Sequence, residues 1–532
     1  MGGRQDNGAG NISFKYSLST CCRLASNLSP TCFQSPICFD KVRSRLKFSV
    51  MKKIVQFCFV SLFLVCSTGS FLVAQETKNG VVKDGDWYFT NKVYTQGDYG
   101  YGQVEYSGKK EGVAFINESG RLAGDVQIPG HILGIGRSAS GIIAFYTQEW
   151  SERSYKRIRT INAALIDPVQ KKILLDKTVY SNPGSDEPMP EIGNDPEGNF
   201  EYLLIRGVRF KDEIDVTLSM SFVFFSPGLE ASARPFPSVA IGNTYIGSCT
   251  GFHKEVFVTS QLNGRLITEK FDQAGKLTDS LSVAAPFRKG RHFDALLGLD
   301  RPSGGSVQVA VKYIEQNKDY ISGLFRFDFE TGKTYAAVGI ALAKDYTMHL
   351  KELQSDIRTS RLRSLEDLKP VELFETGDRI IVVSNIEYTS SLGIRDVPPK
   401  YTSGAGIVTV YDKSLKLIKE FVLDKKLECT VNLNGGLGSR FVNGKLYILS
   451  PELPGNGNGL SDFCYLLDPI GLTLDKKKLD RVNASGGMVL NPTTVFWFPD
   501  HLIMSHVIGE HFLGTRWTTT LQKVSLQSLR SE

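Results

Sequence analysis

Aromatic, guanidinium, imidazole and carboxylate side chains gather between the apolar runs of this 532-residue chain. Aromatic rings and guanidinium groups suit sugar rings, carboxylates and peptides, which they bind by stacking and by paired hydrogen bonds. These residue types therefore predict a ligand-binding site. The candidate residues are His131, Trp150, Arg153, Glu191, Arg291, His292, His349 and Trp517.

Catalysis is a second hypothesis for the same segments. Cleavage of a glycosidic bond needs two carboxyl groups at a set separation, and Asp186, Glu187, Glu191 and Asp294 supply carboxyl groups. Sequence distance does not pair them, so no catalytic residue is assigned. We favour a non-catalytic protein that binds a glycan, peptide or protein partner, with a glycan-active hydrolase or lyase as the alternative.

Other site chemistries find little support in the sequence. His501, His506 and His511 are spaced five residues apart, and this spacing alternates the faces of a strand instead of directing three imidazoles at one metal. The chain has no Gly-x-Ser-x-Gly followed by a suited acid and histidine, and no Gly-rich loop that ends in Gly-Lys-Ser/Thr. We therefore expect neither a metal nor a cofactor.

The candidate segments connect short runs of β-branched and aromatic residues, which are typical of strands. A strand that ends in an Asx or Ser side chain recurs along the chain, and this short polar side chain favours a hairpin turn. The recurring positions are Asn117, Asp167, Ser226, Asp272, Asp328, Asp412 and Asp468. Their spacing averages about 58 residues, near the blade period of propeller repeats.

Each repeat can be read as four antiparallel strands. In the fourth repeat we expect strands at 239–246, 255–261, 265–271 and 277–283. Small sheets of this kind bury both faces only by packing on one another around an axis. With eight long apolar runs in the chain, we predict an all-β fold, a β-propeller of eight blades of four antiparallel strands, with seven blades as the alternative. A strand near 75–82 is expected to complete the last, truncated blade.

In a propeller, the loops from the second to the third strand and from one blade to the next meet at one edge. The candidate residues lie in such loops, so we expect them to share that edge. The longest interval between turns contains a short helical insertion at about 346–369, because Leu350, Leu353 and Ile357 have helical spacing and Pro370 ends the pattern.

The N-terminal part of the chain predicts export. Met51 is followed by two lysines, an apolar run at 54–65 and small residues up to Ala74, as in a cleaved secretory signal peptide. We expect residues 51–74 to be the signal peptide and 75–532 to be a single propeller domain of a secreted or periplasmic protein. An uncleaved anchor is the alternative, although the run is shorter than the ~20 residues that span a bilayer. Residues 1–50 are an over-extended start or an unstructured leader, with a transit sequence as the alternative.

Charge and cysteine usage agree with this division. Residues 1–74 contain nine of the 62 Lys and Arg and two of the 56 Asp and Glu, which leaves 53 against 54 in the remainder. The remainder lacks the excess of positive charge that nucleic acids require, so we expect no nucleic-acid partner, and no membrane span after cleavage. Only Cys249, Cys429 and Cys464 follow Ala74, without the paired spacing of a metal site. We expect a monomer.

With this periodicity and a signal that ends in Val73-Ala74-Gln75-Glu76, the chain resembles the broad class of secreted bacterial β-propeller proteins. The signal looks like those of Bacteroidota exports. The resemblance covers most of 75–526 and includes no family signature, such as a WD dipeptide or a kelch double glycine in each blade. It implies the propeller fold and carries over no catalytic residue.

Overall fold

The computed structural model describes residues within one compact unit, Ala74–Glu532. These residues are 82–84, 87–90, 93–106, 110–149, 158–181, 187–194, 199–211, 214–225, 228–236, 244–250, 255–262, 264–272, 274–284, 293–303, 305–315, 320–338, 368–390, 400–425, 427–429, 436–452, 460–480, 489–510 and 516–529. The predicted leader (1–50) and signal peptide (51–74) lie outside them, as does most of the predicted helical insertion. Among the described residues, no helix is long and apolar enough to cross a membrane.

The described residues form eight antiparallel sheets, numbered here 1 to 8 along the chain. Sheet 1 contains β2 (Trp87–Phe89), β3 (Tyr94–Gln96), β4 (Tyr99–Tyr106), β5 (Lys110–Asn117) and β6 (Leu122–Ile128). Sheet 2 contains β7 (His131–Ser138), β8 (Gly141–Thr147), β9 (Thr160–Asp167) and β10 (Lys172–Ser181). Sheet 3 contains β11 (Glu187–Asn194), β12 (Phe200–Lys211), β13 (Ile214–Phe225) and β14 (Ala231–Phe236). Sheet 4 contains β15 (Thr244–Thr250), β16 (Val256–Leu262), β17 (Arg265–Phe271) and β18 (Leu277–Ala284).

The remaining sheets follow the same plan. Sheet 5 contains β19 (Phe293–Ser303), β20 (Ser306–Glu315), β21 (Tyr320–Asp328) and β22 (Lys333–Val338). Sheet 6 contains β23 (Leu368–Thr376), β24 (Arg379–Ser390), β25 (Lys400–Asp412), β26 (Leu417–Leu423) and β27 (Leu427–Cys429). Sheet 7 contains β28 (Gly438–Val442), β29 (Lys445–Glu452), β30 (Ser461–Asp468) and β31 (Thr473–Leu479). Sheet 8 contains β32 (Val489–Leu490), β33 (Phe496–Trp497), β34 (His501–Glu510), β35 (Arg516–Ser525) and β1 (Val82–Asp84), accompanied by η2 (Pro492–Thr494) and α5 (Leu526–Leu529).

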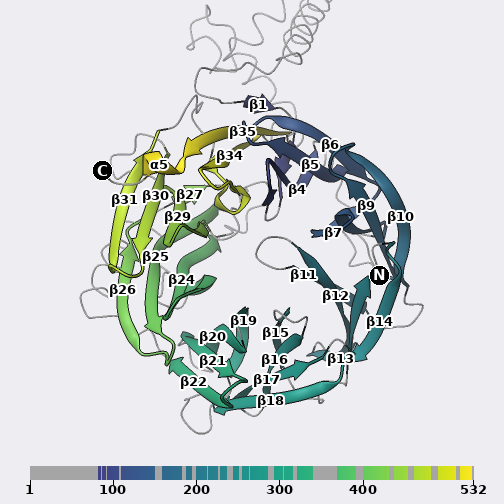
Figure 1. The fold of residues 1–532 in the computed structure, drawn as a ribbon, viewed down its shortest axis with the longest axis vertical. Coiled ribbons are helices and arrows are strands. Elements are labelled where there is room, and N and C mark those ends of the chain that lie inside the picture. Colours follow the sequence, from purple (N-terminus) through teal and green to yellow (C-terminus); the bar gives the residue numbers. More distant parts are fainter. Residues whose placement is uncertain are drawn as a thin grey trace, which may run out of the picture. The chain divides into compact units, whose positions relative to one another are not determined.

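Adjacent sheets pack face to face around a ring, with the later strands of each sheet at the rim (Figure 1). Apolar clusters join sheet 1 to 2, 2 to 3, 4 to 5, 5 to 6, 6 to 7, 7 to 8 and 8 to 1. Sheets 3 and 4 meet where Tyr202 Oη lies 2.9 Å from Ser248 Oγ. The predicted all-β propeller is therefore confirmed, whereas the number of blades stays a prediction.

Burial follows the position of a strand within its sheet. The second strand of sheet 2, β8, is buried over nearly its whole length, whereas its fourth strand, β10, alternates exposed and partly buried residues. Phe271, in the third strand of sheet 4, is 1% exposed, as expected for a residue between two sheets. Apolar side chains on both faces of the middle strands thus form the core.

The polar residue that ends the third strand organises the turn to the fourth strand. Asn117, Asp167, Asp272, Asp328, Asp412 and Asp468 each accept hydrogen bonds at Oδ1 from backbone N–H groups two to four residues later. The repeat on which the prediction rested is therefore a series of Asx turns. Ser226 lies outside the described residues.

An N-terminal strand closes the ring, as expected. This strand is β1, Val82–Asp84, a few residues later than the predicted range 75–82. β1 pairs with β35 through Val82↔Leu521, Lys83↔Thr520 and Asp84↔Thr519. The Thr519 hydroxyl donates to the Trp87 carbonyl, which also joins sheet 8 to sheet 1. At this seam Gly100 faces the Phe496 ring so closely that a Cβ atom would overlap it.

Two predicted boundaries were wrong. The first strand of sheet 4 is β15, Thr244–Thr250, instead of 239–246, because its position is set by pairing with β16, from Thr244↔Gln261 to Thr250↔Val256. Leu368 and Lys369, assigned to the helical insertion, are paired in β23 with Ile386 and Asn385.

Candidate functional site

The strands of each sheet have two ends. We call one end the loop edge; it carries the connections from second to third strands and from one sheet to the next, where the candidate residues were expected. We call the opposite end, which carries the Asx turns, the turn edge. Of the eight candidates, only His131 has a described side chain. Trp150, Arg153, Arg291, His292 and His349 lie outside the described residues.

Three candidates lie on strands instead of loops. His131 is the first residue of β7, with its Cα opposite that of Thr147. Glu191 is in β11, the first strand of sheet 3, with its Cα opposite that of Leu204. Trp517 is in β35, opposite Gly509. The expectation of loop positions was wrong because backbone pairing extends these strands beyond their apolar runs: β11 has the sequence EPMPEIGN, without the apolar alternation that marks a strand.

His131 is held by a carboxylate between sheets 1 and 2. Its Nδ1 lies 2.5 Å from Glu111 Oε1. The second oxygen of Glu111 accepts hydrogen bonds from the Ile132 amide, at 2.9 Å, and from Gln103 Nε2, at 3.0 Å. The Glu111 side chain is 12% exposed and that of His131 29%. The candidate imidazole therefore joins two blades at the loop edge.

A similar pair joins sheets 7 and 8. His506 Nε2 lies 2.7 Å from Asp462 Oδ2, and both side chains are buried. His501, on the same strand, has a separate carboxylate partner in Asp500, at 2.6 Å from Nδ1. Each of these two imidazoles thus has its own carboxylate.

Another buried carboxylate, Glu452, ties together strands of sheet 7. Tyr465 Oη lies 2.7 Å from its Oε1, and Lys476 Nζ lies 2.7 Å from its Oε2. Both donors also reach the carbonyl of Asp424, which follows the last long strand of sheet 6. Burial raises the pKa of Glu452, while the hydrogen bonds from Lys476 and Tyr465 act in the opposite direction.

Next to this group, a lysine is buried at the loop edge of sheet 6. Lys425 is 3% exposed, and its Nζ lies 2.5 Å from Ser403 Oγ. Asn385 Nδ2 donates to the same hydroxyl at 3.0 Å. The positive charge of Lys425 also lowers the pKa of Glu452. The charged groups of sheets 6 and 7 therefore interact across the seam between these sheets.

The sequence prediction did not include these three carboxylates, because they lie on strands and not in the loops between them. Glu111, Glu452 and Asp462 lie at strand ends, inside or beside apolar runs. A carboxylate at such a position is a signal in itself, because a buried charge requires a partner.

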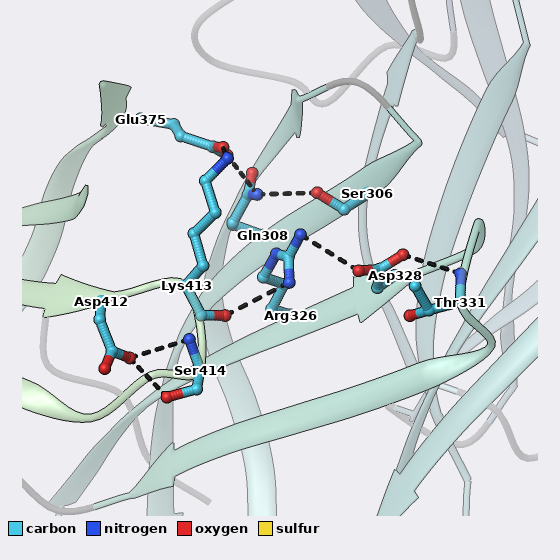
Figure 2. Close-up of polar contacts among 9 residues, drawn as sticks. All are labelled: Ser306, Gln308, Arg326, Asp328, Thr331, Glu375, Asp412, Lys413 and Ser414. Atoms are coloured by element: carbon cyan, nitrogen blue, oxygen red, sulfur yellow. Dashed lines mark hydrogen bonds and ion pairs between the residues drawn. The ribbon is translucent and has the colours of Figure 1, made fainter. Parts of the chain in front are cut away.

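The turn edge contains a polar group between sheets 5 and 6, drawn in Figure 2. The Glu375 carboxylate accepts from Gln308 Nε2 at 2.6 Å and lies 3.1 Å from Lys413 Nζ. Arg326 donates to the Lys413 carbonyl at 3.3 Å and pairs with Asp328 at 3.3 Å. These contacts connect the turns of neighbouring blades.

Within the described part of the chain, no group of three or more His, Cys, Asp or Glu residues is placed to hold a metal ion. Cys464 is a free thiol. Burial raises the pKa of the Cys464 thiol to about 12, so that thiol stays protonated near neutral pH.

A search of protein families finds no match to this chain, and neither does a search of curated proteins. Solved structures with a similar fold include the WD40 domain of SCAP from fission yeast, with 8% identity over 84% of this chain and 97% of that one, and a TM-score of 0.36. An ulvan lyase, from a polysaccharide lyase family, has 9% identity, coverage of 84% and 98%, and a TM-score of 0.39. The β-propeller domain of the Trilobed protease from Pyrococcus furiosus has 10% identity, coverage of 75% and 98%, and a TM-score of 0.36.

Proposed function

We propose that this chain is an exported propeller that binds a glycan, peptide or protein partner at its loop edge, without catalysis. One observation carries the proposal: Glu111, Glu452 and Asp462, at this edge, are each engaged by a basic side chain of the chain itself. A carboxylate held in this way serves to fix strands and blades, because removing its partner would leave a buried charge. The edge is therefore a rigid support for the loops that it carries.

Binding by those loops is supported by their residue types. Trp150, Arg153, Arg291 and His292 combine aromatic and cationic groups in two of these connections. Such pairs suit sugar rings and carboxylates, by stacking and by charge-assisted hydrogen bonds.

The test is a glycan and peptide array probed with the chain 75–532, followed by calorimetric titration of each hit. Trp150→Ala and Arg153→Ala should each weaken binding by about tenfold or more, as truncation of an aromatic or arginine anchor does. Lys172→Ala, at the turn edge, is the matched control and should leave the affinity unchanged. Equal affinities for all three variants would contradict binding through these loops.

The same hits separate binding from catalysis. Each hit is incubated with the chain, and its size and reducing ends are followed by mass spectrometry and a colorimetric assay. Intact ligand is the expected result. Cleavage that persists in independently purified batches would establish the glycan-active enzyme instead.

Export is tested separately, by expression of the whole chain in a bacterium and mass measurement of the protein recovered outside the cytoplasm. We expect an N-terminus at Gln75, after the small residues that end at Ala74. A product that keeps residues 51–74 would support the anchored alternative.

A further inference from the structure

The seam between sheets 5 and 6 contains a small crevice. Sheet 5 contributes Ala310 and Gly323, whose small size leaves space, and sheet 6 contributes Ser384, Thr409 and Tyr411. Leu324, Val382 and Tyr411, which also line the crevice, belong to the apolar cluster that joins the two sheets. The crevice thus lies between two blades and is lined by three residues of sheet 6 that carry hydroxyl groups.

The Thr409 hydroxyl is the central feature. Thr409 is 1% exposed, and its Oγ1 has no hydrogen-bond partner among the described residues. Ser384 and Tyr411, which border the same crevice, are 2% and 8% exposed. Burial raises the pKa of Tyr411 to about 12, so its phenol keeps its proton near neutral pH and remains available as a donor.

A buried hydroxyl without a partner is unfavourable, because the hydrogen bonds it made to water in the unfolded chain are not replaced. The crevice offers about 20 Å³ to the centre of a water molecule. A space of roughly 10–15 Å³ or more, bordered by two to four polar groups, is sufficient to hold one water. The crevice therefore has both the volume and the polar groups that one water molecule requires.

We propose that this crevice is a binding site for a single structural water, which hydrogen-bonds to Thr409 Oγ1 and to at least one of the hydroxyls of Ser384 and Tyr411. The water completes the hydrogen bonds of Thr409 and lies among hydroxyl groups of two strands of sheet 6, β24 and β25, beside the surface of sheet 5. It fills the space left by Ala310 and Gly323, so the two blades keep full contact through it.

The rest of the seam supports this assignment. Gln308 and Arg326, toward the turn edge, face the same neighbouring sheet (Figure 2), and Gln308 Oε1 and Arg326 Nε are buried without a partner among the described residues. Gln308 itself is 0% exposed. Polar groups that need a further partner thus recur along one blade interface, as in an interface that contains water.

The experiment is a high-resolution crystal structure of the chain 75–532, with Thr409→Val and Thr409→Ser as matched variants. We expect a density peak at hydrogen-bond distance from Thr409 Oγ1 in the parent chain and in Thr409→Ser, and no such peak, or a shifted one, in Thr409→Val. Valine has nearly the shape of threonine, so loss of the peak reports on the hydroxyl group.

Thermal unfolding gives an independent measurement. If the water satisfies Thr409, Thr409→Val removes one of its partners and should lower the midpoint by about 1–3 °C. A rise in the midpoint would overturn the proposal, because it would mean that an unsatisfied hydroxyl had been replaced by a methyl group. A dry crevice in the parent chain, with Thr409 rotated onto a protein carbonyl, would also overturn it and does not depend on the folding of any variant.

Discussion

At the scale of single residues, the loop edge is defined by buried carboxylates that hold their neighbours. The pair of Asp462 with His506 shows this most directly, because both side chains are buried and they come from adjacent sheets. Glu111 and His131 repeat the arrangement two seams farther along the ring. His131, which the sequence predicted to bind a ligand, is thus part of the contact between two blades.

Asp462→Ala should destabilise the chain by about 1–3 kcal/mol, because it leaves a buried imidazole without its hydrogen-bond partner. Urea unfolding followed by tryptophan fluorescence measures the change. Asp500→Ala is the control: His501 is also buried, but the Asp500 carboxylate is exposed, so water screens this pair and the loss of Asp500 should destabilise the chain much less. If Asp462→Ala were as stable as the parent chain, the pair would not be structural, and a functional role for the Asp462 carboxylate would have to be considered.

At the scale of elements, the recurring device is the turn between the third and fourth strands. Asp412 Oδ1 accepts from the Ser414 and Lys416 amides at 2.8 and 2.9 Å. The hydrogen bonds from the Ser414 hydroxyl and the Lys416 amide hold the pKa of Asp412 below its ordinary value. The equivalent turn of sheet 1 is made by Asn117, with the same acceptor atom and no charge.

Asp412→Asn should therefore keep the turn, whereas Asp412→Ala should cost up to about 1 kcal/mol at pH 7, a typical net value for lost hydrogen bonds at an exposed site. The two proteins are compared by urea unfolding at several pH values. The pKa of Asp412 is lower in the folded than in the unfolded chain, so its charge stabilises the fold at pH values above the unfolded pKa of about 3.9. This stabilisation is lost as the pH falls through the folded pKa.

The variants separate charge from hydrogen bonding. Asp412→Asn should lack the part of the acid dependence that belongs to this carboxyl group, while its stability at neutral pH changes little. An Asp412→Ala variant that unfolded at the same urea concentration as Asp412→Asn would show that the side-chain acceptor does not support the turn.

At the scale of the whole molecule, closure of the ring joins the two ends of the folded chain. β1 adds only Val82, Lys83 and Asp84 to sheet 8, whereas the seam between sheets 8 and 1 is packed by a large apolar cluster with Trp87, Phe89, Phe496 and Leu521. Most of the stability of this seam should come from that cluster, and β1 should chiefly cover the open edge of β35.

A chain that begins at Gly85 should consequently still fold, at a cost of about 2 kcal/mol for the lost strand pairing. It should also self-associate, because β35 would present unpaired N–H and C=O groups. Thermal unfolding and light scattering, compared with the chain 75–532, measure the two effects. A truncated chain that stayed monomeric and equally stable would exclude a closing role for β1.

The sequence by itself determined what depends on neighbouring residues. The Asx turns from Asn117 to Asp468 and the β-branched runs between them predicted the propeller, because each turn is made by a side chain and backbone amides within four residues of it. Only the tertiary structure decided which polar groups meet: Asp462 and His506 are 44 residues apart, and the Thr409 crevice needs Ala310 from another blade. Such contacts arise from the packing of one sheet on the next, and local spacing contains no information on which side chains a blade interface will bring together.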